Sequence, residues 1–132
     1  MLVEIKLAYN CLEKIKELFK EYTDMLVKED EKFAKYLKMQ DYDLELENLQ
    51  IKYGIPLGRL FLATVEGEVA GCIALRYVDK KTCELKRLYV KPEFRGNQIG
   101  DVLIEHIIDD AKEIQNKVVF NVARTLKKED AK

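Results

Sequence analysis

One run of the sequence, residues 85–104, limits the fold more than any other, because a strand, a turn and a helix start follow directly on one another. The apolar strand pattern stops at Val90, and Pro92 cannot continue it. Arg95 and Gly100 then lead into a helix whose first-turn N–H groups have no partner inside that helix. Such donors, together with the positive end of the helix dipole, attract phosphate, so the run predicts a site for a phosphorylated cofactor.

Length and charge indicate one domain with a small-molecule partner. The 132 residues suit a single domain, 1–132, and 23 Lys plus Arg nearly balance 24 Asp plus Glu. This balance predicts no basic face of the kind that nucleic-acid binding requires. Glu4 and Lys6 interrupt the apolar N-terminus, and no apolar run approaches the ~20 residues that span a bilayer. We therefore expect a cytoplasmic protein that binds neither nucleic acid nor membranes.

The cysteines and the histidine give little support to a disulfide or a metal site. Three widely spaced cysteines, Cys11, Cys72 and Cys83, lie in helix or strand patterns, which argues against a disulfide framework and a zinc site. Cys83 lies on the strand before the glycine run, where it is either a packed residue or a nucleophile. His106, the only histidine, falls among acidic residues and is expected on a helix surface. No metal is expected.

Helical spacing is typical of the first half of the chain. Apolar residues recur every three or four positions, with charged residues on the opposite face. Gly54 and Pro56 mark the end of this part. The pattern predicts N-terminal helices within 12–53: one from about residue 12 to about residue 26, a short continuation at 33–37, and a second helix over 44–53.

From Leu60 the pattern changes to apolar runs rich in β-branched residues, which are typical of strands. Short turns separate the first three runs and predict an antiparallel meander over 60–90. A helix and a last strand follow, and that strand should run parallel to the one before it. The expected fold is α+β, a mixed and mainly antiparallel sheet with helices on both faces. The predicted strands are 60–65, 69–78, 83–90 and 118–122, and the predicted helix covers 99–111.

This order of elements, with the run RGNQIG at 95–100, resembles the GCN5-related N-acetyltransferase (GNAT) superfamily. The family's loop reads Arg or Gln, two residues, Gly, one residue, then Gly or Ala. Arg95 and Gly100 fit this pattern, whereas Gln98 stands in place of the middle glycine. The resemblance implies a three-layer, acyl-CoA N-acyltransferase-like fold, in which segment 95–122 supplies the cofactor loop, a helix and a parallel strand.

The resemblance also implies acetyl-CoA as cosubstrate. Main-chain N–H groups of the loop would hold its diphosphate, and the end of the preceding strand would run beside its pantetheine arm. Arg95 would bond to a phosphate or form a salt bridge within the loop. Gln98 would crowd the phosphates with its Cβ or require a different backbone angle. The implied cofactor-binding residues are Leu88, Tyr89, Val90, Arg95, Gly96, Asn97, Gln98, Ile99 and Gly100.

The same resemblance implies direct transfer of the acetyl group to an amine. The N–H of Leu88 would stabilise the oxyanion that forms when the amine attacks. Glu84 would remove a proton from the amine, directly or through a water molecule. The alternative is that Glu84 only pairs with Lys86 or with a neighbouring strand. Tyr89 would act as the acid for the leaving thiolate only if it faces the cleft; otherwise it is a packed aromatic.

The chain is short at its C-terminal end compared with the family, which usually adds a helix carrying the acid and two strands. The strand at 118–122 would then present an apolar edge, so a homodimer through this edge is expected.

The expected acceptor is a small-molecule or peptide amine. Acidic residues near the first helices either attract this amine or only solvate a helix face. Two alternatives are a catalytically weak acyl-CoA-binding or regulatory module and an interaction domain without cofactor. These acidic residues are Asp41, Asp43, Glu45 and Glu47.

Overall fold

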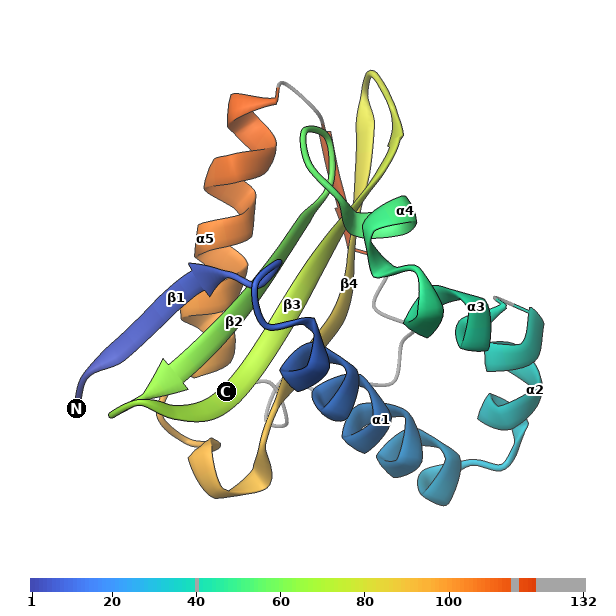
Figure 1. Ribbon diagram of the computed structural model, residues 1–132, viewed down its shortest axis with the longest axis horizontal. Coiled ribbons are helices and arrows are strands. Elements are labelled where there is room, and N and C mark those ends of the chain that lie inside the picture. The colour runs from blue at the N-terminus through green and yellow to red at the C-terminus, as the bar shows by residue number, and fades with distance from the viewer. Residues whose placement is uncertain (40, 115–116, 121–132) are drawn as a thin grey trace.

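The computed structural model describes residues 1–39, 41–114 and 117–120. They form a five-stranded sheet in the order β1-β2-β3-β4-β5 (Figure 1). Neighbouring strands are antiparallel, except β4 and β5, which are parallel. The elements are β1 (Val3–Leu7), α1 (Leu12–Glu29), α2 (Lys32–Met39), α3 (Tyr42–Glu47), α4 (Leu49–Tyr53), β2 (Arg59–Val65), β3 (Glu68–Asp79), β4 (Thr82–Val90), the 3₁₀ helix η1 (Pro92–Phe94), α5 (Ile99–Glu113) and β5 (Lys117–Phe120).

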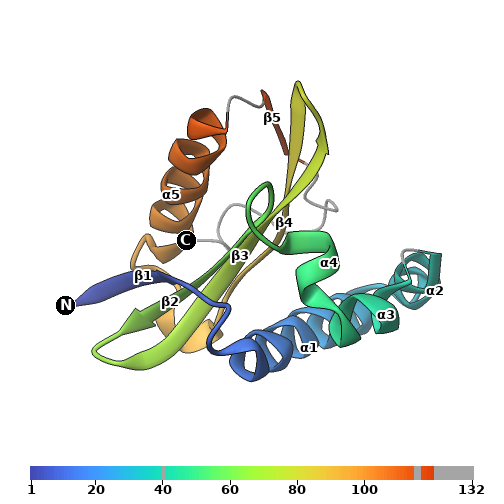
Figure 2. The same cartoon turned by 45° about the horizontal axis from the view of Figure 1, so that its top comes forward.

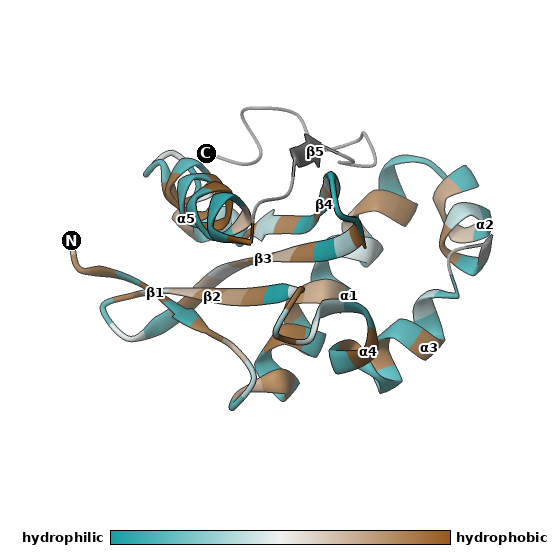
Figure 3. Cartoon of the chain, turned by 90° about the horizontal axis from the view of Figure 1, so that it is seen from above, coloured by the Kyte–Doolittle hydropathy of each residue, from teal (hydrophilic) through white to brown (hydrophobic). Residues whose placement is uncertain are grey.

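The sheet separates two apolar cores, each covered by helices. Helix α5 lies on one face, and α1 lies with α3 and α4 on the other (Figure 2, Figure 3). Because successive side chains of a strand point to opposite faces, β3 contributes to both cores. Cys72 and Ala74 pack on the α1 side, whereas Ile73 and Leu75 pack on the α5 side. The predicted mixed, mainly antiparallel sheet with helices on both faces is therefore confirmed.

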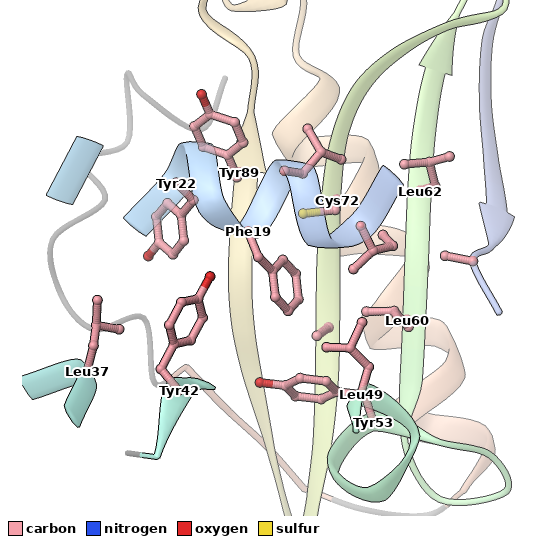
Figure 4. Close-up of a cluster of buried hydrophobic side chains, with 14 of the residues drawn as sticks. Phe19, Tyr22, Leu37, Tyr42, Leu49, Tyr53, Leu60, Leu62, Cys72 and Tyr89 are labelled. Carbon is pink, nitrogen blue, oxygen red and sulfur yellow. The ribbon is translucent and has the colours of Figure 1, made fainter. Parts of the chain in front are cut away.

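The two long helices pack through apolar stripes. In α1 the stripe includes Phe19, whose ring meets that of Tyr53 in α4 edge to face, with ring centroids 6.2 Å apart (Figure 4). In α5 the fully buried residues recur at every fourth position, which is one face of a helix. No helix of the described ranges is both long and apolar enough to cross a membrane. The α5 stripe consists of Ile99, Leu103, Ile107 and Ala111.

The N-terminal half differs from the prediction in two places. Residues 3–7, for which no strand was expected, form β1 and pair with β2, because their apolar and charged side chains alternate as in a strand. The single helix expected over 44–53 is wrong. Asn48, with φ −136°, interrupts it and separates α3 from α4. The last strand is described at 117–120, and residues 121–122 of its predicted range lie outside the described residues.

Candidate active site

The loop between β4 and α5 is the segment predicted to bind an anion. It passes through η1 and then through Gly96, whose φ is 87°, before α5 begins at Ile99. Within the described chain, the N-cap residue Gln98 makes no side-chain hydrogen bond to the first turn. A Cβ added at Gly96 would meet no atom within 4 Å. The loop therefore combines an uncapped helix N-terminus with open space beside Gly96, which leaves room for an anion.

Gln98 adopts the backbone conformation that its glycine counterpart in the family pattern favours. Its φ of 61° and ψ of 22° lie in the left-handed region. A residue with a Cβ is strained there, at a cost of roughly 1 kcal/mol. The loop thus keeps its left-handed turn without the middle glycine, and this strain lowers the stability of the fold.

Two side chains hold the loop to the rest of the fold. The Nε of Arg95 donates a hydrogen bond to the carbonyl of Val90, at 2.9 Å, and its guanidinium lies 5.6 Å from the ring centroid of Tyr89. Asn97 donates through Nδ2 to the carbonyl of Phe94, at 3.0 Å. Arg95 therefore links the loop to the end of β4, which neither of the two roles predicted for it includes.

Strand β4 carries a bulge next to the predicted oxyanion donor. Arg87 has a φ of 59°, and the pairing with β3 shifts register between Cys72 and Ala74. A bulge adds a residue to one strand and turns the following side chains over. As a result Leu85 and Leu88, three positions apart, both pack in the core on the α5 side.

Beyond the bulge, the main-chain groups of Leu88 face away from β3. The N–H of Lys91 donates to Ala70 on β3, whereas the carbonyl of Val90 accepts from Arg95 on the other side. Successive residues of a strand direct their main-chain groups to alternate sides, so Leu88 shares the side of Val90. The described pairing of β5 covers Thr82 to Leu85 of β4. Splaying of β4 from β5 at Leu88 stays a prediction, because residues beyond 120 are not described.

The α1 side of β4 carries a cluster of charged side chains that reaches α3 and α4. Arg87 and Glu45 form an ion pair of 2.9 Å with side chains only 2% and 1% exposed. Lys52 of α4 binds the same carboxylate at 2.8 Å. Glu84 accepts a bond of 2.6 Å from Nη1 of Arg76 on β3. We call Glu45, Lys52, Arg76, Glu84, Lys86 and Arg87 the charged cluster.

Burial shifts the pKa of two members of the charged cluster. Burial alone would raise the pKa of Glu45, but hydrogen bonds and charges from Arg87 and Lys52 outweigh it and lower that pKa to about 2. Burial, aided by the positive charges of Arg87 and Lys52, lowers the pKa of Lys86 to about 8. Glu45 is therefore a buried structural carboxylate, which corrects its interpretation as part of an acidic exposed segment.

Tyr89 is a packed aromatic on the α1 side. Its ring lies 5.8 Å from that of Tyr22 (Figure 4). Its hydroxyl donates to Glu21 at 3.3 Å. Burial raises its pKa to about 12. The hydroxyl is thus hydrogen-bonded to α1, and of the two predicted roles the packed aromatic describes Tyr89.

Cys83, on the other face of the sheet, is fully buried in the core on the α5 side.

Comparison with known proteins agrees with this arrangement. The sequence matches the model of the acetyltransferase (GNAT) family over residues 12–128. The chain belongs to this family. An uncharacterized N-acetyltransferase of Dictyostelium discoideum is 29% identical to this GNAT chain, over 96% of the chain and 84% of the relative. One of Schizosaccharomyces pombe is 38% identical, over 77% of the chain and 65% of the relative.

Solved structures place the fold in the same family. The crystal structure of an acetyltransferase from Streptococcus agalactiae has a TM-score of 0.70 and 28% identity. That similarity covers 89% of the GNAT chain and 71% of the solved chain. The predicted acyl-CoA N-acyltransferase-like fold and family membership are confirmed.

The structure places some of the predicted site residues next to one another and others apart. The loop residues Gly96 to Gly100 and the strand end at Leu88 to Val90 adjoin one another through Arg95. Glu84 lies four residues before Leu88 and pairs with β3, as one predicted alternative requires. Among the described residues, no group of three or more His, Cys, Asp or Glu side chains is placed to hold a metal ion. The buried pair of Arg87 and Glu45 was not predicted.

Replacing Gln98 by Gly should stabilise this GNAT chain by about 1 kcal/mol, because glycine tolerates the left-handed backbone without a Cβ clash. Urea unfolding measures the change. Gln50→Gly, on the exposed face of α4, is the matched control and should destabilise by about 1 kcal/mol, since it places glycine inside a helix. Equal effects at both positions would contradict strain at Gln98.

Proposed function

We propose that this chain is an N-acetyltransferase that moves the acetyl group of acetyl-CoA directly to an amine of a small molecule or peptide. The observation that carries the proposal is the uncapped N-terminus of α5 behind the open loop at Gly96, at the end of the bulged strand β4. Family membership supports acetyl transfer as the reaction.

In this proposal the loop binds the diphosphate of the cosubstrate. N–H groups of Gly96, Asn97, Gln98, Ile99 and Gly100 converge on one anion at the positive end of the α5 dipole. Arg95 acts as a positioning residue, since it fixes the loop against the carbonyl of Val90. Leu88, Tyr89 and Val90 provide the strand edge for the pantetheine arm.

The chemistry requires two proton movements. Glu84 takes one proton from the acceptor ammonium, directly or through a water molecule, and leaves a neutral amine. The amine nitrogen then bonds to the carbonyl carbon of the thioester while the N–H of Leu88 stabilises the negative oxygen. The carbon–sulfur bond breaks, and the second amine proton goes to the departing thiolate. The thioester supplies an activated acetyl group, so no metal enters this scheme.

A catalytically weak acyl-CoA-binding module is the second candidate. The observation that favours it is the ion pair between Arg76 and Glu84, which engages the carboxylate that must accept the proton. Both candidates require the cosubstrate site, and only the first requires turnover.

A pair of glycine substitutions tests the cosubstrate site. Gly96 and Gly67 have similar φ angles, 87° and 82°, and open space around the position of a Cβ. Either residue replaced by Ala should cost about 1 kcal/mol of stability. Only Gly96 lies in the loop that leads into α5, so Gly96→Ala alone should weaken acetyl-CoA binding, at least tenfold by calorimetry. Equal affinities in the two variants would overturn the loop as the binding site.

Two further expectations from the sequence stay predictions. Strand β5 is the last strand of the described sheet and pairs with β4, which supports a homodimer through its other edge. Sedimentation equilibrium should then give twice the chain mass, and a monomer at micromolar concentration would contradict it. The second expectation is a cytoplasmic location, which imaging of the tagged chain in its own cells tests.

A further inference from the structure

A hollow lies between α3, α4 and the β3–β4 hairpin, next to the predicted base. Its volume is about 690 Å³. Arg76 and Lys52 line it together with Glu45. Since Arg76 holds Glu84 at 2.6 Å, the hollow adjoins the carboxylate that takes the proton in the proposed reaction.

The charged cluster around this hollow carries more cations than carboxylates. Lys52, Arg76, Lys86 and Arg87 are four cations, whereas Glu45, Glu84 and Asp41, which also lines the hollow, are three carboxylates. Arg87, 4% exposed, and Lys86, 6% exposed, are buried, so solvent screens their charges weakly. The excess positive charge favours an anionic group in the hollow.

Lys86 is the least compensated member of the charged cluster. It makes no hydrogen bond or ion pair with another described residue, although it is 6% exposed. Burial disfavours the charged form of its ammonium. The charges of Arg87, Lys52, Glu45 and Glu84 all act on it, so it lies close to charged groups of the hollow, although it is not itself a lining residue. A bound carboxylate nearby would favour the charged form.

The ion pair at the edge of the hollow offers one group of each charge. Arg76 is 43% exposed, and only its Nη1 is bonded to Glu84 among the described residues. An acceptor with an ammonium and a carboxylate on one carbon can present the first to Glu84 and the second to the remaining N–H groups of Arg76.

Apolar side chains at the mouth of the hollow suit the rest of such an acceptor. Leu44 is 59% exposed and Ile51 is 84% exposed, and both line the hollow. Tyr77 also lines it. Exposed apolar residues gathered at one opening mark a binding surface for an apolar group.

We infer that the acceptor is a free α-amino acid with an apolar side chain, bound in this hollow with its carboxylate on Arg76 and its amine toward Glu84. Lys86 and Lys52 add positive potential, and Leu44 and Ile51 contact the side chain. The inference rests on the proposed acetyl transfer and names its acceptor. It differs from the expectation that acidic residues of this region attract a cationic amine, since Glu45, one of these four residues, is neutralised by Arg87 and Lys52.

The test compares two acceptors that differ in the α-carboxylate. L-Phenylalanine and L-phenylalaninamide share the ring and the α-amine, but the amide lacks the carboxylate. Release of coenzyme A with acetyl-CoA present should give a kcat/KM at least tenfold higher for phenylalanine. In Arg76→Gln and in Lys86→Met this preference should fall at least fivefold. Lys81→Gln, in the turn of the same hairpin, removes an exposed charge outside the hollow and should keep the preference.

The possible outcomes test the acceptor assignment separately from the proposed acetyl transfer. Transfer to the amide or to a peptide amine as fast as to phenylalanine would overturn the acceptor assignment and leave the proposed acetyl transfer standing. A preference that persists in both Arg76→Gln and Lys86→Met would overturn the hollow as the acceptor site. No transfer to any amine, with acetyl-CoA bound, would contradict acetyl transfer itself and the acceptor assignment with it.

Discussion

Glu84→Gln should lower kcat for amine acetylation by roughly 10²–10⁴, the range typical of a lost general base. Glutamine keeps the size of the side chain and an oxygen that accepts the bond from Arg76, but it does not take a proton from the amine. Release of coenzyme A, followed at saturating acetyl-CoA, measures the effect.

Two controls make the Glu84 result specific. The affinity for acetyl-CoA, measured by calorimetry, should stay within twofold, since Glu84 is assigned to the acceptor side. Glu68→Gln, at the exposed start of β3, should leave kcat within twofold. A kcat for Glu84→Gln within threefold of the parent would mean that another group accepts the proton.

Glu45→Gln should destabilise the fold by about 3–5 kcal/mol, because it leaves the guanidinium of Arg87 buried without its countercharge. Urea unfolding measures the loss. Glu47→Gln lies on the same helix, is exposed, and should change stability by less than about 0.5 kcal/mol. A double variant, Glu45→Leu with Arg87→Met, should recover part of the loss, because it removes both charges.

The same pair predicts how stability depends on pH. The pKa of Glu45 falls to about 2 in the folded chain from its usual 4.5. The unfolded chain therefore binds this proton first, and the contribution of the pair is complete above about pH 4.5 and is lost as pH falls toward 2. The stability difference between the parent and Glu45→Gln should shrink over this interval. A constant difference from pH 6 to pH 2 would contradict a depressed pKa.

The buried pair also links a helix far away in sequence to the proposed oxyanion donor. Glu45 and Arg87 are 42 positions apart, and Arg87 is the residue in the left-handed conformation at the β4 bulge. The pair therefore fixes the bulge immediately before Leu88. An amide donor stabilises an oxyanion only if it is held in place beforehand, so we expect Glu45 to act on catalysis through this position.

Local patterns predicted most of the fold, including the loop that we propose for the cosubstrate. The apolar stripe of α5, the meander and the loop at 95–100 all depend on residues close in sequence, where period and turn chemistry are informative. The sequence also holds a sign of the bulge. Cys83 and Leu85 alternate with polar residues, but the next apolar positions are Leu88 and Val90, one residue out of step.

Such local patterns did not predict the charged cluster. Glu45 stands among acidic neighbours on a short helix, and nothing adjacent in sequence shows that it is buried against Arg87. The ion pair between Arg76 and Glu84 depends on the register of β3 and β4, where these two residues lie opposite each other. Partners of this kind are fixed by tertiary packing, so only the structure revealed the hollow that we propose for the acceptor.

Titration of the ¹⁵N-labelled chain with acetyl-CoA, followed by amide NMR, tests the central claim most directly. The account predicts that the largest shifts fall on the main-chain N–H groups of residues 96–100 and of Leu88, and that β1 amides on the opposite edge of the sheet stay in place. Saturable shifts confined to other residues, or no shifts at millimolar acetyl-CoA, would contradict the assignment of the β4–α5 loop as the cosubstrate site.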